Sequence, residues 1–583
     1  MSNYTANTSR EERTVASLVD MIKRSELKLP EMQRGYVWTS TQVRDLIDSL
    51  YRGYPSGAIL MWEAEEQDAT RDLQVAQEKS AFSTHKLLLD GQQRLTSLSA
   101  VLRNEPVQVR NRNKPIHIAF NLDHPDSLTQ ADDDIDNELE EEVTDTPESK
   151  GVQARVRDLA FAVASSSVLS KPNWIPVSRV FSDNESEWSL LKPLVGTPEH
   201  PNYTKYTERI RALKAIANYT YVVQVLGRKL SYEEVTAIFV RVNSAGAKLR
   251  GSDLALAQIT SKWPGSLALF EHFLDSIYKQ SKWDLDTGII VRSLVVFATG
   301  QSRFKTVGNI PRERLEEAWQ RTQIGIEGAL NFLRSNAGLE DVSMLSSRFY
   351  IIAIAWYFAE KKGVLSHQDT VDMLRWLYSA SIRAWYSAST ETTLDSDLSV
   401  LRNGGSFGDL AKQIEQTYGV LYITAEDLKE RGKRSPLFTF SYLACKYHGA
   451  VDWESGAPLS LFHQGHAAHI EFHHIFPKSL LQKTEFSKAQ INEIANMAFL
   501  SGKANRGISN KSAHVYLPTV VNRRGEMALQ KQGIPTSVET WNDYASFLNH
   551  RRTALAAMIN AFIRKAASEG QATQVPLEKS GES

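Results

Sequence analysis

The sequence has little cysteine, no long apolar run and no excess of charge of either sign. A single cysteine, Cys445, excludes an internal disulfide framework and a cysteine-rich zinc site, and it is compatible with a reducing compartment. The first residues lack the basic-then-apolar pattern of a secretion signal. The longest uncharged apolar run, Phe349 to Ala359, is far shorter than the roughly twenty residues that span a bilayer. We therefore expect a cytoplasmic protein with no membrane partner, in which this run forms a buried helix.

The charges balance over the whole chain, with 67 Lys and Arg against 68 Asp and Glu, so any basic surface must be local. Between His474 and Arg524 eight Lys and Arg face only Glu485 and Glu493. A charge run alone is more often a solvated face, but a local excess of this kind also suits a phosphate backbone. The candidate phosphate contacts are Lys478, Lys503, Arg506 and Lys511.

A chain of 583 residues with 42% hydrophobic residues is too long for one ordinary core and predicts two or three domains. The first 260 residues combine helical and strand patterns, as expected of a mixed α/β domain. Val43, Leu46 and Leu50 repeat at helical spacing, with Ser40 or Thr39 as the N-cap and Gly53 as the stop. Strands are predicted at residues 58–62, 86–89, 116–120 and 219–225.

From about Leu254 to Tyr442 the chain is predicted to be helical, with a break at residues 403–406. An acidic, apolar-poor segment between Asp123 and Glu148 is typical of a solvated loop or insertion. An amphipathic helix is expected around residues 544–563 and a polar tail from Ser568. The fold class is therefore a multidomain α+β protein with an N-terminal domain at 12–260, a helical connector at 261–440, a third domain at 441–566 and a flexible tail at 567–583.

The most informative stretch lies in the third domain. Two adjacent imidazoles, His473 and His474, precede Pro477, and they are followed by Asn496 and then by Asn505 in a basic turn. This is the order of parts in an HNH, or ββα-metal, nuclease. In such a site a histidine takes a proton from water while one divalent ion stabilises charge on the phosphate and the leaving oxygen.

The spacing predicts a strand from Ile470 to Phe476, a further element from Ile491 to Leu500, and a turn that Asn505 opens. Two adjacent histidines alone are more often packing or surface residues. The prediction of a nuclease site therefore depends on Pro477, Asn496, Asn505 and the basic flank following the histidines at the expected spacing. His463, His466 and His469 lie just upstream at a spacing of three. They could bind zinc, but a solvated loop is favoured because no cysteine or fourth ligand accompanies them.

These residues, with Lys503-Ala504-Asn505-Arg506-Gly507, resemble the HNH domain of the GmrSD type IV restriction family and those of RNA-guided nucleases. The resemblance implies that His474 is the general base, that His473 and Asn505 are metal ligands, and that Asn496 belongs to the catalytic group by bracing the hairpin. His473 departs from the Asp or Glu of many such sites, which changes the expected metal preference. Mg²⁺ or Mn²⁺ is expected because phosphate chemistry favours hard ions.

A second motif, Asp90-Gly91-Gln92-Gln93-Arg94, follows a predicted strand and opens a predicted helix. A helix N-terminus is a natural anion site, and Arg94 adds a charge-assisted contact, so a phosphate could bind there. A strand–turn–helix junction is, however, usually only a junction.

This motif resembles the hallmark of the ParB-like N-terminal domain of the same GmrSD family. The segment that includes Gln33, Arg34, Tyr36 and Trp38 resembles that domain's opening motif, and residues 238–249 resemble a third motif, with Ala245 where family members often have Gly. The resemblance implies binding and hydrolysis of a nucleoside triphosphate. The expected contacts are Asp90, Gly91, Gln92, Gln93, Arg94, Gln33 and Arg34.

The resemblance as a whole implies a restriction endonuclease that nicks or cleaves modified or phage double-stranded DNA, regulated by its N-terminal domain. Partners would include that DNA and either further copies of the chain or other defence-system proteins. Two alternatives stay open: a DNA-modification sensor with degenerate catalysis, and an RNase toxin that halts the infected cell.

Overall fold

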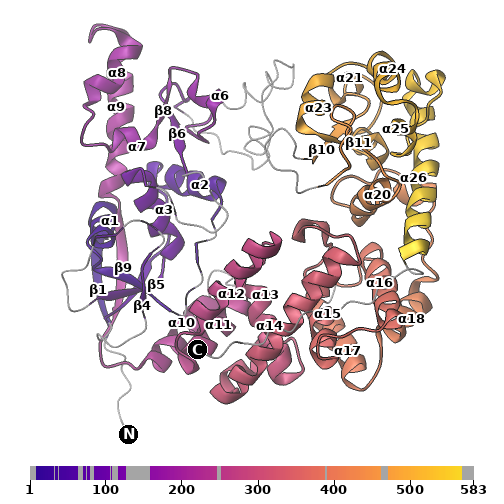
Figure 1. Cartoon of the computed structure of the whole chain (residues 1–583). Helices are drawn as coiled ribbons and strands as arrows, with labels where there is room; N and C mark the ends of the chain where they lie inside the picture. Colours follow the sequence, from indigo (N-terminus) through magenta and orange to yellow (C-terminus); the bar gives the residue numbers. More distant parts are fainter. Residues whose placement is uncertain are drawn as a thin grey trace. The chain divides into compact units, whose positions relative to one another are not determined.

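The computed structural model describes residues 8–566 apart from 32, 34, 37, 64–69, 74, 76, 79–84, 106, 108–115, 127–157, 246–250, 388–389 and 461–469. The chain divides into two compact units, Met1–Leu269 and Phe270–Ser583 (Figure 1). The predicted acidic insertion, the polar tail and the three upstream histidines fall largely or wholly outside the described residues. The predicted domain boundaries at 260 and 440 fall inside the helices α11 and α20, whose bounds are given below.

The first unit is built on a mixed six-stranded sheet in the order β1-β9-β3-β5-β2-β4. Its strands are β1 (Thr8–Thr14), β2 (Leu27–Pro30), β3 (Ile59–Glu63), β4 (Thr70–Arg71), β5 (Lys86–Asp90) and β9 (Thr220–Leu226). A separate three-stranded antiparallel sheet places β6 (Ile118–Asn121) between β7 (Phe161–Val163) and β8 (Trp174–Pro176). The strands predicted from β-former content are confirmed to within about two residues.

Helices cover both faces of the six-stranded sheet. The helices of this unit are α1 (Val15–Lys23), α2 (Ser40–Tyr51), α3 (Gln92–Arg103), α6 (Ser166–Leu169), α7 (Val177–Val180), α8 (Glu187–Val195), α9 (Tyr203–Lys214), η1 (Ala215–Asn218), α10 (Tyr232–Ala245) and α11 (Gly251–Lys262). As predicted, α2 begins after Thr39, whose hydroxyl accepts from the Gln42 N–H in a capping box.

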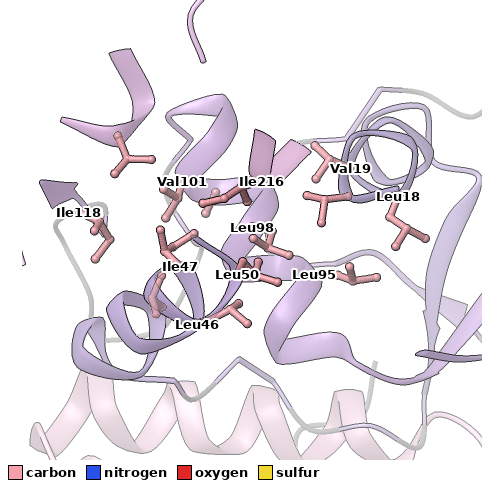
Figure 2. Packing of buried hydrophobic residues seen from close by; sticks show 14 of the residues in the cluster. Leu18, Val19, Leu46, Ile47, Leu50, Leu95, Leu98, Val101, Ile118 and Ile216 are labelled. Atoms are coloured by element: carbon pink, nitrogen blue, oxygen red, sulfur yellow. The ribbon is translucent and has the colours of Figure 1, made fainter. Parts of the chain in front are cut away.

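Successive side chains of the central strands point to opposite faces of the sheet, so the apolar core forms two clusters, one on each face. Met61 and Leu88 belong to the cluster on one face, together with apolar side chains of α1, α2 and α3 that include Ile47 and Leu98 (Figure 2). Trp62 packs on the opposite face, in the cluster that contains residues of α10 and α11. The β5–α3 junction, which carries the Asp90-to-Arg94 motif, is therefore fixed by apolar packing on both sides of the sheet.

The second unit is mainly helical. Its first part comprises α12 (Ser266–Ser281), which begins in the first unit, α13 (Thr287–Thr299), η2 (Phe304–Asn309), α14 (Arg312–Ser335), η3 (Val342–Met344), α15 (Phe349–Glu360), α16 (His367–Ile382), α17 (Thr390–Arg402), α18 (Phe407–Tyr418), α19 (Ala425–Leu428) and α20 (Pro436–Tyr447). The apolar run at 349–359 is confirmed as a buried helix, α15, and the predicted break at 403–406 separates α17 from α18.

The C-terminal part of this unit contains a two-stranded antiparallel sheet with short helices around it (Figure 1). Its elements are β10 (Ile470–His474), α21 (Lys478–Leu481), α22 (Lys488–Ile491), η4 (Ile494–Asn496), β11 (Met497–Ser501), α23 (Gly502–Ile508), α24 (Ala513–Arg524), α25 (Met527–Gln530), η5 (Val538–Trp541) and α26 (Tyr544–Ala566). The predicted strand 470–476 ends two residues early. The prediction that Asn505 opens a turn is wrong, because Asn505 lies inside α23, which Ser501 caps.

Candidate functional site

The two adjacent histidines lie at the end of β10, where they pair with the start of β11. His473 is opposite Ala498 and His474 is opposite Met497. Successive residues of a strand point to opposite faces, and the two side chains differ accordingly in environment. His473 is buried, with 4% of its surface exposed, whereas His474 is half-buried.

His473 and Asn505 meet although 32 positions separate them. The Nδ1 atom of His473 lies 2.8 Å from the Oδ1 atom of Asn505. Burial lowers the pKa of His473 to about 4, with a further lowering from His474, while the contact with Asn505 acts in the opposite direction. The imidazole is therefore neutral near pH 7, which is the protonation state of a metal ligand.

This pair fits a divalent ion. Two adjacent ligands at about 2.1 Å from one octahedral ion stand about 3 Å apart, close to the observed separation. Because an amide oxygen only accepts, Nδ1 carries the proton in the contact with Asn505, and an ion held between these two atoms would require the other tautomer of His473. The buried Nε2 atom of His473 has no hydrogen-bond partner among the described residues. In the part of the chain that the structure describes, no group of three or more His, Cys, Asp or Glu side chains is placed to hold a metal ion by itself. Mg²⁺ typically keeps several water ligands.

His474 is oriented by Asn492, a residue that the sequence analysis did not identify. The Nε2 atom of His474 lies 3.2 Å from Oδ1 of Asn492, whose Nδ2 donates to the Lys488 carbonyl at 2.9 Å. Because that second bond directs the amide oxygen toward the ring, Nε2 carries the proton and Nδ1 carries the lone pair in the neutral form. The only sequence signal for this role is a helix C-terminal Asn shortly before Asn496.

Asn496 braces the hairpin from η4. Its Oδ1 accepts from the Phe476 N–H at 2.8 Å, and its Nδ2 donates to the carbonyls of Phe476 and Ile491 at 3.1 and 3.0 Å. The side chain is fully buried. These contacts give Asn496 a bracing geometry, and a part in the chemistry itself stays a prediction.

Two neighbouring arginines of α26 hold the backbone around η4. Arg551 is fully buried and donates to the carbonyls of Ala495 and Met497 at 2.8 and 2.6 Å, and burial lowers its pKa to about 10. Arg552 makes two hydrogen bonds, of 2.6 and 2.7 Å, to the buried carboxylate of Glu493. Sequence periodicity placed both residues on a helix but could not show that they hold the site.

The candidate phosphate contacts lie around these elements. Lys503 and Arg506 are exposed on α23, the helix that carries Asn505, and Lys478 begins α21 just after the strand. Lys503 lies 3.7 Å from Glu454, and the Lys511 ammonium donates to the Gly507 carbonyl at 3.4 Å.

The N-terminal motif has the predicted strand–turn–helix form. Asp90 ends β5, Gly91 adopts a φ of +97°, and Gln92 begins α3. The residue before α3 is a glycine, so no side chain caps this helix N-terminus, which is the end of a helix that favours an anion. The Asp90 side chain is 45% exposed beside this turn.

Arg94 is engaged inside the protein. Its guanidinium donates to the carbonyls of Ser56 and Ala58 at 2.5 and 2.8 Å and to the Asp90 carboxylate at 3.1 Å, and its side chain is only 14% exposed. Arg94 thus holds the loop before β3, a role that the sequence did not indicate.

The opening motif packs against the second motif. Gln33 is buried and donates to the carbonyls of Leu88 and Leu89 at 2.7 and 2.6 Å. Gln93 accepts from the Trp38 N–H at 3.3 Å, and Gln92 is buried at the start of α3. Arg34 lies outside the described residues, as does the turn that follows Ala245.

Among the described residues, no helix combines the length and apolar character that crossing a membrane requires.

Two comparisons with known proteins show what this chain is similar to. Residues 15–260 match the family model for the N-terminal domain of the GmrSD restriction endonuclease. An uncharacterized protein of Methanocaldococcus jannaschii is 25% identical over 543 residues, which cover 87% of each chain. The β5–α3 motif, Gln33 and the α10 segment all lie inside the matched region. The N-terminal part of the chain is therefore similar to the N-terminal domain of GmrSD restriction endonucleases, which supports a restriction endonuclease of the GmrSD type.

Proposed function

We propose that the chain is a metal-dependent HNH endonuclease that cuts modified or phage double-stranded DNA in an antiphage restriction system of the cytoplasm. The observation that carries the proposal is the 2.8 Å contact between His473 and Asn505 beside His474 at the end of one hairpin. The family match over residues 15–260 supports the restriction context independently of this site.

In the proposed reaction His474 acts as the general base. Its Nδ1 atom takes a proton from a water molecule as the water oxygen attacks phosphorus and the bond from phosphorus to the leaving oxygen breaks. Asn492 holds the ring by accepting from Nε2–H and still accepts when the ring is charged. A bound Mg²⁺ or Mn²⁺, held by His473 and Asn505, would supply charge stabilisation on the phosphate and the leaving oxygen.

The N-terminal unit is proposed to bind and hydrolyse a nucleoside triphosphate. The start of α3 after Gly91 is a helix N-terminus suited to a phosphate, and the partly exposed carboxylate of Asp90 could hold a Mg²⁺ ion or a water. Gln92 and Gln93 stand at the same helix start. Arg94 and Gln33 contribute mainly by fixing the loops around it, since most of their described contacts are with protein carbonyls and the remaining one joins Arg94 to the Asp90 carboxylate.

The nuclease is tested with plasmid and modified phage DNA in Mg²⁺ or Mn²⁺, with and without nucleoside triphosphate. Wild type is compared with His474→Ala, and His550→Ala is the matched control because His550 is exposed and bonded within its own helix. Cutting by wild type and the control, with loss in His474→Ala, is expected. If no DNA is cut by any variant, the proposal is wrong, and cutting of RNA alone would favour the toxin alternative.

Nucleotide turnover is tested with Asp90→Asn, and Arg94 is left unchanged. Removing Arg94 would release the loop at Ser56 and Ala58, so its effect would mix folding with binding. Asp90→Asn keeps the size of the side chain and removes its charge. Loss of hydrolysis with an unchanged melting temperature supports the proposal, and unchanged hydrolysis contradicts a role for Asp90.

A further inference from the structure

A basic loop at residues 429–435 joins α19 to α20, in the segment that the sequence analysis assigned to the helical connector. Four of its side chains are cationic and exposed, namely Lys429, Arg431, Lys433 and Arg434. Lys429 is paired with Glu426 at 2.9 Å. Arg434 makes no ion pair with any residue that the structure describes. This loop lies outside the segment from His474 to Arg524, where the sequence has a local excess of Lys and Arg.

The backbone of the basic loop is fixed to the candidate site. The Glu430 N–H donates to the buried Glu493 carboxylate at 2.9 Å, and the Ile494 N–H donates to the Arg431 carbonyl at 2.7 Å. A Cβ atom placed on Gly432 would stand 3.1 Å from the carbonyl oxygen of Asn492. Asn492 is the residue that orients His474, so the basic loop and the proposed base both contact Asn492.

Lys433 extends along the same face of β10 as His474. Its ammonium lies 5.0 Å from the centre of the Phe472 ring, and the rings of Phe472 and His474 are 6.4 Å apart. Phe472 and His474 are two positions apart on a strand and therefore share a face. The two distances together place the ammonium at most about 11.4 Å from the centre of the His474 ring.

We propose that Arg431, Lys433 and Arg434 bind the phosphodiester backbone of duplex DNA next to the bond that is cut. At that distance from the proposed base, the loop would meet a phosphate within a few nucleotides of the cut. An exposed basic loop is commonly a solvated surface. What distinguishes this one is a backbone anchored to Glu493 and Ile494, which holds Lys433 within about 11.4 Å of the proposed base with little ordering needed on binding.

This inference rests on the proposed nuclease function, and its test separates the two. The protein is the full chain with His474→Ala, which keeps the loop and prevents cutting. Binding to a duplex of about 20 base pairs is measured over a range of salt concentrations, because each phosphate contact contributes about 0.9 to the slope of log affinity against log salt. The loop variant is Arg431→Gln with Lys433→Gln and Arg434→Gln.

A matched control removes three exposed cations from other helices of the same unit, as Arg312→Gln with Arg314→Gln and Lys412→Gln. Both variants change the formal charge equally, so a nonspecific effect of net charge would be the same in both. Because all six side chains are exposed, melting temperatures are expected to stay close to that of the parent.

The loop variant is expected to lose up to about 2.7 units of salt slope, about 0.9 for each of the three contacts, and at least about 10- to 100-fold in affinity near 0.1 M salt, with the control unchanged. Unchanged binding in the loop variant, or equal loss in the control, would overturn the inference. If the loop-dependent slope is present but the wild-type chain cuts nothing, the nuclease proposal fails and the binding surface stands. If only an RNA duplex of equal length shows the slope, the assignment to DNA is overturned.

Discussion

The Nε2 atom of His474 lies 3.2 Å from the Oδ1 atom of Asn492, and these residues come from different elements, β10 and the C-terminus of α22. The amide of Asn492 is itself held by the Lys488 carbonyl. A polar partner of this kind fixes both the tautomer and the orientation of a histidine.

Asn492→Ala is expected to lower the cleavage rate about 10- to 100-fold, because the ring of His474 loses the acceptor that orients it. Asn492→Asp keeps an acceptor but adds a charge that favours the protonated ring. The acidic limb of the pH–rate profile should then move to higher pH by about one unit. The measurement is the pH dependence of plasmid cleavage in the two variants. A purely structural role would leave the shape of that profile unchanged in Asn492→Asp.

Arg551→Lys is expected to destabilise the second unit by about 2–4 kcal/mol, because an ammonium cannot reach the carbonyls of both Ala495 and Met497 as the guanidinium does. Thermal unfolding followed by circular dichroism measures the effect. Arg564→Lys, at an exposed position of the same helix, is the control and should leave the melting temperature unchanged. Equal melting temperatures for the two variants would contradict the bracing role of Arg551.

Asp397 provides a pH-dependent term in stability. Burial raises its pKa to about 6, although Tyr386 and Trp385 donate to its Oδ2 atom at 2.7 and 3.0 Å. The folded state therefore binds more protons than the unfolded state between about pH 4 and 6. The contribution of Asp397 to the free energy of unfolding therefore falls as pH rises through that window, by up to about 3 kcal/mol.

Asp397→Asn should remove this term, so the difference in unfolding free energy between the variant and wild type should grow in the variant's favour from pH 4 to pH 7. Urea unfolding at several pH values gives that difference. A difference that stays constant over the whole range would show that Asp397 does not titrate there.

Gly91→Ala is expected to destabilise the β5–α3 junction by about 1–3 kcal/mol. Its φ is +97°, and an added Cβ would lie 2.4 Å from Cδ1 of Ile59. Gly53→Ala is the control for backbone strain alone, since its φ is +70° and no atom lies within 4 Å of the added Cβ. Combining Gly91→Ala with Ile59→Val removes the clashing methyl and should recover part of the melting temperature. Equal effects of the two single variants would mean that the contact with Ile59 is unimportant.

Local patterns in the sequence determined most of the elements. The capped helix after Thr39, the strand that ends in Asp90 and the buried helix α15 all follow from short-range rules of capping, strand propensity and apolar content. The order of His473, His474, Asn496 and Asn505 in the sequence also predicts a ββα arrangement. The sequence misplaced Asn505 in a turn because the cap at Ser501 starts a helix that the Gly-containing segment does not signal.

Only the tertiary structure decided which side chains meet. The contacts of His474 with Asn492, of Glu493 with Arg552 and of the basic loop with Glu493 join segments between 18 and 63 positions apart. The same holds for Arg94, which the motif suggested for a phosphate but which binds carbonyls of a loop 36 and 38 positions earlier. Periodicity and capping report interactions within a few residues of each other, whereas long-range polar partners are chosen when buried donors and acceptors must be satisfied as the core closes.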